Sequence, residues 1–135
     1  MKIRKISLEE ALPVRHKVLW PNKPIEYCIV EGDDTGLHIG VELDGAIVSV
    51  ASIYVSDGVA RLRKFATYPD YQGKGLGTSL IKFALDNLKS QNVDYFWCDA
   101  RESAIGFYQR FGMTVSGERF YKGDVPYFKM GLSLR

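Results

Sequence analysis

The chain has 135 residues, of which 46% are hydrophobic and 25% charged, and its net charge is +2. This length suits one domain with its own hydrophobic core, so we predict a single domain over residues 1–135. The small net charge does not indicate a nucleic-acid-binding or membrane surface, and no apolar run approaches the roughly 20 residues of a membrane span. Because MKIRKISLEE is no signal peptide, we predict a cytoplasmic protein that binds neither nucleic acid nor membrane.

The N-terminal segment predicts a strand followed by a helix. KIRKIS alternates and should form a short strand, and Ser7 is a typical N-cap for a helix that begins with LEEA. Glu10 completes a capping box, and Pro13 is expected within the first helical turn, where proline is tolerated. The helix should end near WPNKP, whose two prolines indicate a loop.

The next segment predicts three antiparallel strands. LHIGVEL, AIVSVASIYV and VARLRKFAT are rich in β-branched and apolar residues. The dipeptides Asp44-Gly45 and Asp57-Gly58 separate them and favour tight hairpin turns.

The second half of the chain alternates between helix and strand. A glycine-rich loop follows Pro69, and a helix is expected from about Gly75 to Gln91, because leucines and alanine recur there every four residues. DYFWCDA predicts a strand, and SAIGFYQRF a helix that ends before Gly112. MTVSGERFY and PYFKMGLSL predict a closing hairpin. The whole order, β-α-β-β-β-α-β-α-β-β, indicates an α/β fold with a mixed sheet and helices on its faces.

The loop YQGKGLG, residues 71–77, has the features of an anion-binding loop. A glycine-rich segment that opens a helix directs backbone N–H groups and the positive end of the helix dipole toward one point. The spacing fits neither the phosphate loop GxxxxGK[ST] nor the dinucleotide fingerprint GxGxxG. The alternative is a plain flexible turn in which Gly77 only allows close helix packing.

Two motifs in register resemble the GNAT superfamily of acyl-CoA-dependent N-acetyltransferases. FATYPDYQGKGLGTSLI is similar to its acyl-CoA-binding motif Q/R-x-x-G-x-G/A, here Gln72, Gly75 and Gly77, and SAIGFYQRFGM is similar to its second motif. The resemblance covers nearly the whole chain. It implies a GNAT-like, mostly antiparallel mixed sheet of about seven strands with helices on both faces.

The resemblance also implies where acetyl-CoA binds. The pantetheine arm would lie along Phe65, Ala66 and Thr67, on a strand that carries a bulge in similar proteins. A backbone N–H near Phe65 or Ala66 would donate to the thioester carbonyl. The backbone amides implied to hold the CoA pyrophosphate are those of Gln72, Gly73, Lys74, Gly75, Leu76, Gly77 and Thr78.

Tyr108 matches the tyrosine that protonates the leaving thiolate in many members of this superfamily. A phenol has a pKa of about 10 and a thiol about 8.5, so the phenol stays protonated at neutral pH and can donate a proton. The alternative is an ordinary helix tyrosine beside Phe107 and Phe111, with its hydroxyl group in solvent.

The sequence departs from the superfamily pattern at two points. Arg101 stands where many relatives have an asparagine that contacts the cofactor, although an arginine could reach a phosphate. VARLRKFAT lacks the glutamate that serves as general base in many relatives. Other residues could be the base, but each is also explained by solvation or structural pairing: Glu118, Asp99, Glu26, His16 and His38.

The acceptor site is the least defined part of the prediction. Arg61 and Arg63 share a sheet face if strand alternation holds, with Phe65 next on it. Arg63 would meet either a carboxylate of the acceptor or a structural acid, and Glu118 is the second candidate for acceptor binding. Several aromatic residues could shape an amine pocket or simply pack: Trp20, Tyr27, Tyr121, Tyr127 and Phe128.

The predicted function is acetyl transfer from acetyl-CoA to a primary amine of a small molecule or peptide, by direct attack and without a metal. Cys28 and Cys98 are expected to be reduced thiols, with Cys98 in the core. The alternative is a non-catalytic acyl-CoA sensor, and a third interpretation is an unrelated phosphate-binding domain. Because dimers are common in the superfamily, a homodimer is also compatible with the resemblance.

Overall fold

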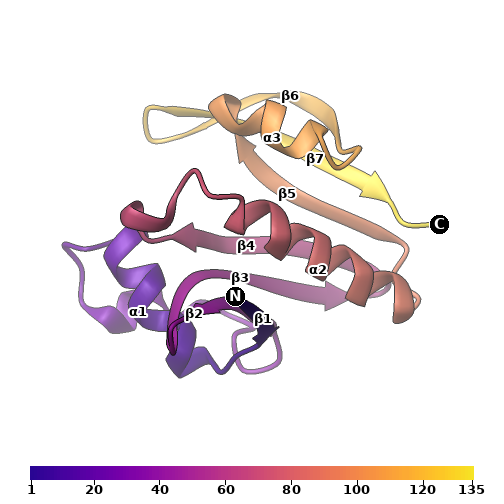
Figure 1. Ribbon diagram of the computed structural model, residues 1–135. Coiled ribbons are helices and arrows are strands. Elements are labelled where there is room, and N and C mark those ends of the chain that lie inside the picture. The colour runs from indigo at the N-terminus through magenta and orange to yellow at the C-terminus, as the bar shows by residue number, and fades with distance from the viewer. The chain divides into compact units, whose positions relative to one another are not determined.

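A computed structural model describes all residues, 1–135. Seven strands and three α-helices follow one another along the chain in the predicted order (Figure 1). The strands are β1 (Lys2–Lys5), β2 (Leu37–Leu43), β3 (Ala46–Ser56), β4 (Val59–Thr67), β5 (Tyr95–Arg101), β6 (Thr114–Lys122) and β7 (Val125–Ser133). The α-helices are α1 (Leu8–Leu19), α2 (Leu76–Ser90) and α3 (Ile105–Gln109), with 3₁₀ turns η1 (Ile25–Cys28), η2 (Pro69–Tyr71) and η3 (Glu102–Ala104).

The strands form one mixed sheet in the order β1-β2-β3-β4-β5-β7-β6. β1 with β2, β2 with β3, β5 with β7, and β6 with β7 pair antiparallel, whereas the start of β4 pairs parallel with β5. A parallel pair requires a crossover connection, which α2 supplies. The predicted fold class, a mostly antiparallel mixed sheet of about seven strands with helices, is confirmed.

The chain divides into two compact units. The first unit comprises Met1–Tyr54 and Leu62–Asn87, and the second comprises Val55–Arg61 and Leu88–Arg135. That residues 1–135 form a single domain stays a prediction. No helix in either unit has both the length and the apolar composition needed to cross a bilayer.

The predicted local signals of the first unit are confirmed, with one correction. The Ser7 hydroxyl accepts the Glu10 backbone N–H and the Glu10 carboxylate accepts the Ser7 N–H, which closes the capping box. Asp44 and Gly45 have φ values of 50° and 83°, so both residues are left-handed, as a tight hairpin turn requires. Pro13 lies inside α1, not in its first turn, because the helix begins at Leu8 and a turn has only about 3.6 residues.

The core of the first unit lies between α1 and the sheet. Ala11 and Val14 of α1 pack against Val50 of β3 and Ala66 of β4, and all four side chains are at most 4% exposed. These apolar positions lie three residues apart on α1, the spacing that places side chains on one helix face. Ala66 therefore lies on the face of the sheet that packs against α1.

The backbone of β4 is irregular at Lys64, whose φ is +55°. Val50 and Tyr54 are four residues apart on β3 and share a face. Ala66 packs with Val50, and the Arg63 guanidinium lies over the Tyr54 ring, so Ala66 and Arg63 share that face too. Residues three apart on a regular strand point to opposite faces. The left-handed residue thus acts as a β-bulge does, and the expectation that strict alternation extends from Arg63 to Phe65 is wrong.

Candidate functional site

The glycine-rich loop of the first unit turns directly into α2. Gly73 and Gly75 have φ values of +75° and +80°, a left-handed backbone that other L-residues adopt only with strain. The Gly75 carbonyl accepts the Ser79 backbone N–H at 3.1 Å, which is the first hydrogen bond of the helix. The first N–H groups of a helix are the donors that its N-terminus leaves without intrahelical partners.

The loop leaves space beside its backbone. A Cβ atom at Gly73 or Gly75 would meet no atom within 4 Å. The Gln72 amide nitrogen donates to the Thr67 carbonyl at 3.0 Å, which ties the loop to the end of β4, and the Lys74 ammonium lies 5.6 Å from the Tyr71 ring centre. An accessible helix N-terminus with a nearby lysine fits a phosphate group. These residues therefore suit the pyrophosphate that the sequence predicts.

The end of β4 is held by the first unit's own polar groups. The Thr67 hydroxyl lies 2.7 Å from the Ser49 hydroxyl, and the Tyr68 N–H donates to the Val48 carbonyl at 3.0 Å. Ala66 is 4% exposed. The side chains of Ala66 and Thr67 are thus occupied by packing and hydrogen bonding, so a cofactor arm along this segment would have to use backbone groups, as the resemblance implies.

Tyr108 of α3 is buried in the second unit. It is 8% exposed, its ring meets Phe107 edge-on at 5.1 Å, and its hydroxyl hydrogen-bonds to the thiol of Cys98. Burial and the neighbouring Cys98 raise the pKa of Tyr108 well above its ordinary value near 10. The phenol therefore stays protonated at neutral pH, and the alternative with its hydroxyl in solvent is not what the structure shows.

Both cysteines are expected to react slowly in the folded protein. Cys28 and Cys98 are free and at most 2% exposed. Burial raises the pKa of Cys28, and it raises the pKa of Cys98 to about 12, so almost no thiolate of Cys98 forms at pH 8. Titration with a thiol-specific disulfide reagent should detect two thiols in denaturant and a slow reaction without it. Rapid modification of the native protein would contradict this burial.

The candidate general bases differ in their surroundings. Asp99 accepts from Arg61 at 3.0 Å and lies 3.3 Å from the Lys122 ammonium, which is the structural pairing named as its alternative. Both ring nitrogens of His38 are occupied, by the Ser52 hydroxyl at 2.7 Å and the Asp33 carbonyl at 2.8 Å.

The remaining predicted residues lie nearer the surface. His16 contacts the Lys23 carbonyl at 2.6 Å, and Glu26 is exposed in η1. Arg101 ends β5 opposite Tyr127 and is exposed, as is Glu118 on β6. Within the second unit, the Arg61 guanidinium also lies 4.5 Å from the Trp97 ring centre. None of these positions singles out a general base.

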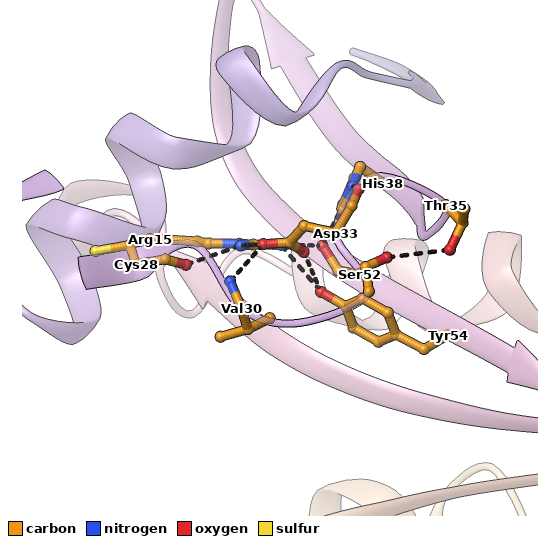
Figure 2. A network of polar contacts seen from close by, with 9 residues as sticks. Arg15, Cys28, Val30, Asp33, Thr35, His38, Ser52 and Tyr54 are labelled. Carbon is orange, nitrogen blue, oxygen red and sulfur yellow. Dashed lines mark hydrogen bonds and ion pairs between the residues drawn. The ribbon is translucent and has the colours of Figure 1, made fainter. Parts of the chain in front are cut away.

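A buried polar network in the first unit was not predicted from the sequence (Figure 2). Arg15 of α1 is fully buried and bonds Asp33 through both terminal nitrogens, at 2.8 and 2.9 Å. It also donates to the Cys28 carbonyl at 3.0 Å and to the Ser52 hydroxyl at 2.8 Å. The Tyr54 hydroxyl donates to the same Asp33 carboxylate. We call Arg15, Asp33 and Tyr54 the buried triad.

One sequence signal pointed toward this network. Arg15 follows Ala11 by four residues, so it lies on the face of α1 that packs against the sheet, where a charge needs a partner. Its partners Asp33, Ser52 and Tyr54 are spread over two other segments, and their spacing reveals no pairing.

Comparisons with known proteins agree with the fold. The model of the acetyltransferase (GNAT) family matches residues 3–113. The chain is 33% identical over 135 residues to the uncharacterized N-acetyltransferase YitI of Bacillus subtilis, covering 93% of this chain and 89% of that protein. The chain therefore belongs to the GNAT family and is an acetyltransferase.

Two solved structures illustrate the shared fold. The ribosomal-protein-S18-alanine N-acetyltransferase of Escherichia coli superposes with a TM-score of 0.82 at 22% identity, over 98% of this chain and 93% of that one. An aminoglycoside 6′-N-acetyltransferase complexed with coenzyme A superposes with a TM-score of 0.79 at 10% identity, over 100% of this chain and 98% of that one. The family uses acetyl-CoA, and these relatives have different acceptors.

Proposed function

We propose that this protein transfers the acetyl group of acetyl-CoA to a primary amine. The observation that carries the proposal is the open loop at the start of α2, where two left-handed glycines leave room for a ligand beside the N–H groups of the first helical turn. Acetyl-CoA would supply an activated acetyl thioester. GNAT enzymes act on amines, and one structural relative carries the name of an alanine N-acetyltransferase.

Each proposed residue has a separate task. The backbone amides of residues 72–78 hold the pyrophosphate, and Arg101 contacts a phosphate. Backbone groups of Phe65, Ala66 and Thr67 bind the pantetheine arm, and an N–H near Phe65 or Ala66 stabilises the oxyanion. Arg63 and Glu118 are the proposed acceptor-binding residues.

Tyr108 is the proposed general acid. When the amine nitrogen bonds to the acetyl carbon and the carbon–sulfur bond breaks, the electron pair of that bond stays on sulfur. The Tyr108 hydroxyl donates its proton to this sulfur and regains one from solvent, while the amine releases its excess proton to solvent. Burial keeps the hydroxyl protonated throughout the neutral range, whereas the raised pKa makes it a weaker acid, so the support for the role is the match of Tyr108 to the tyrosine of the family motif.

A second candidate function is a non-catalytic acyl-CoA sensor. The observation in its favour is that β4 has no carboxylate, while Asp99 and His38 are engaged in structural contacts. Incubation with acetyl-CoA and a panel of amines, followed by thiol release and the mass of the acceptor, distinguishes the two. An acetylated amine supports the enzyme, whereas acetyl-CoA binding without turnover of any amine supports the sensor.

A matched pair of glycine substitutions tests the loop. Gly75 and Gly45 have nearly equal φ values, +80° and +83°, and a Cβ added at either position would meet no atom within 4 Å. Alanine at either position should destabilise the protein by a similar amount, about 1–2 kcal/mol of left-handed strain. Only Gly75→Ala places a methyl group where the pyrophosphate is proposed to bind, so only it should weaken acetyl-CoA binding, by about tenfold for 1.4 kcal/mol.

Calorimetric titration of both variants with acetyl-CoA gives the result, with thermal unfolding as the stability measure. Equal affinities in the two variants would show that the loop does not contact the cofactor. Gly45 lies in the β2–β3 turn of the same unit, so its variant controls for a general loss of stability.

A further inference from the structure

Burying the charged residues of the triad has a large desolvation cost. Arg15 is 0% and Asp33 is 4% exposed, and desolvating such a pair offsets much of its attraction. Apolar side chains of similar volume often stabilise such sites equally well or better. The pair also fixes the geometry of a third group, the hydroxyl of Tyr54, which bonds Asp33 (Figure 2).

The ring of Tyr54 is fixed as firmly as its hydroxyl. A Cβ at Gly36 would lie 2.9 Å from a ring carbon and one at Gly32 would lie 3.3 Å from another, so the ring packs against bare backbone. His38 meets the ring edge-on at 6.5 Å. Tyr54 is thus held at both ends, by Asp33 at its hydroxyl and by the 32–36 segment along its ring.

The triad is unsuited to accept a proton from an attacking amine. Burial alone would raise the pKa of Asp33, but hydrogen bonds from Arg15, Tyr54 and the Val30 N–H lower it to about 2. Burial and the adjacent Asp33 raise the pKa of Tyr54. A carboxylate this acidic is a weak base, so the triad serves to position groups.

The charged group that lies over the ring of Tyr54 is Arg63. Its guanidinium carbon lies 5.9 Å from the ring centre, within cation–π range. Arg63 is half-buried and forms no ion pair with any carboxylate of the first unit. Asp33, which bonds the Tyr54 hydroxyl, is already paired with Arg15. The charge of Arg63 is therefore uncompensated beside a rigid aromatic support.

We propose that Arg63 binds a carboxylate of the acceptor amine, and that the buried triad positions Arg63 for this contact. A guanidinium presents a planar fork of donors that matches a carboxylate. Arg63 precedes Phe65 by two residues, with the left-handed Lys64 between them, so an amine held by its carboxylate at Arg63 would lie near the proposed oxyanion contact. The inference rests on the proposed function, and it names amines that bear a carboxylate as the substrate class.

The direct test follows the side-chain Nε–Hε signal of Arg63 by NMR in the presence of CoA. N-acetylglycine serves as a product mimic, its amide as the uncharged match, and inorganic phosphate as the competing anion. The signal is assigned by its loss in Arg63→Lys, and the Nε–Hε signal of Arg110, which also lies over an aromatic ring at 5.2 Å, is the internal reference. A saturable shift of the Arg63 signal with N-acetylglycine alone is expected.

Variants of Tyr54 test the positioning role. Tyr54→Leu removes the ring and should weaken N-acetylglycine binding about fivefold, as expected for a cation–π contact of about 1 kcal/mol. Tyr54→Phe keeps the ring and should retain most of the affinity. It provides the measurement if Tyr54→Leu folds poorly. Both should bind CoA as the unmodified protein does. A purely structural role would lower melting temperature without changing the preference for acid over amide.

The outcomes separate this inference from the proposed function. No shift, or equal shifts with the acid and its amide, would overturn the carboxylate contact even when CoA binds normally. A larger shift with phosphate would assign Arg63 to a phosphate instead. Failure of CoA itself to bind, measured by calorimetry, would count against the acetyltransferase proposal. The carboxylate contact would then be judged from an Arg63 titration in the absence of CoA.

Discussion

Tyr108→Phe is expected to lower kcat by about 100-fold or more, the usual contribution of a positioned general acid. The substitution keeps the ring that packs edge-on against Phe107 and removes only the hydroxyl. The affinity for acetyl-CoA should stay within a factor of about two, because the loss is confined to the transition state. Steady-state kinetics with an identified amine and calorimetry with acetyl-CoA give the two values.

The control for this variant is Tyr95→Phe. Tyr95 is a half-buried phenol on β5 of the same unit, and no role in the reaction is proposed for it. Loss of its hydroxyl should leave kcat nearly unchanged. If Tyr108→Phe retained full activity, protonation of the thiolate by this residue would be ruled out, and solvent would have to supply the proton.

Asp33→Ala is expected to destabilise the protein by about 3–5 kcal/mol, because it leaves a buried guanidinium without its counter-ion. Arg15 is 0% exposed, and the Tyr54 hydroxyl and the Val30 N–H would lose their acceptor as well. Denaturant unfolding followed by circular dichroism measures the change.

A surface ion pair and a double variant serve as controls. The Arg119–Glu102 pair has side chains 50% and 40% exposed, so Glu102→Ala should cost less than about 1 kcal/mol. Arg15→Met combined with Asp33→Ala should recover much of the stability lost in Asp33→Ala alone, because no unpaired charge remains. If the double variant lost as much free energy of unfolding as Arg15→Met and Asp33→Ala lose together, this explanation would be contradicted.

The same carboxylate predicts a dependence of stability on pH. The pKa of Asp33 is lowered from 3.8 to about 2 in the folded protein, so its ionised form is favoured by folding. This contribution is fully present above the unfolded value, and it is lost as the pH falls from about 4 toward 2. In Asp33→Ala this part of the acid transition should be missing.

The fold was largely predictable because its local signals agree with its tertiary structure. The Asp-Gly dipeptides adopt left-handed turns, Ser7 and Glu10 form the capping box, and the four-residue repeat of leucines places α2 correctly. Each signal acts over a few neighbouring residues. The agreement between local and global preferences is what makes element order readable from one sequence.

The features that were missed depend on distant residues. Arg15 meets Asp33 and Tyr54 across separations of 18 and 39 residues, and none of these side chains has a spacing that reveals the contact. A bulge on this strand was expected from the resemblance alone, because no glycine or proline marks the left-handed position of Lys64. The hydrogen bond between Tyr108 and Cys98 joins a helix to a strand. Such pairings come from packing, which local propensity does not encode.

Calorimetric titration of the purified protein with acetyl-CoA is the most direct test of the central claim, with ATP and NAD as controls. The loop geometry at Gly73 and Gly75 predicts saturable binding of one acetyl-CoA per chain and no comparable binding of either nucleotide. Folded protein that binds neither acetyl-CoA nor CoA would contradict the proposal.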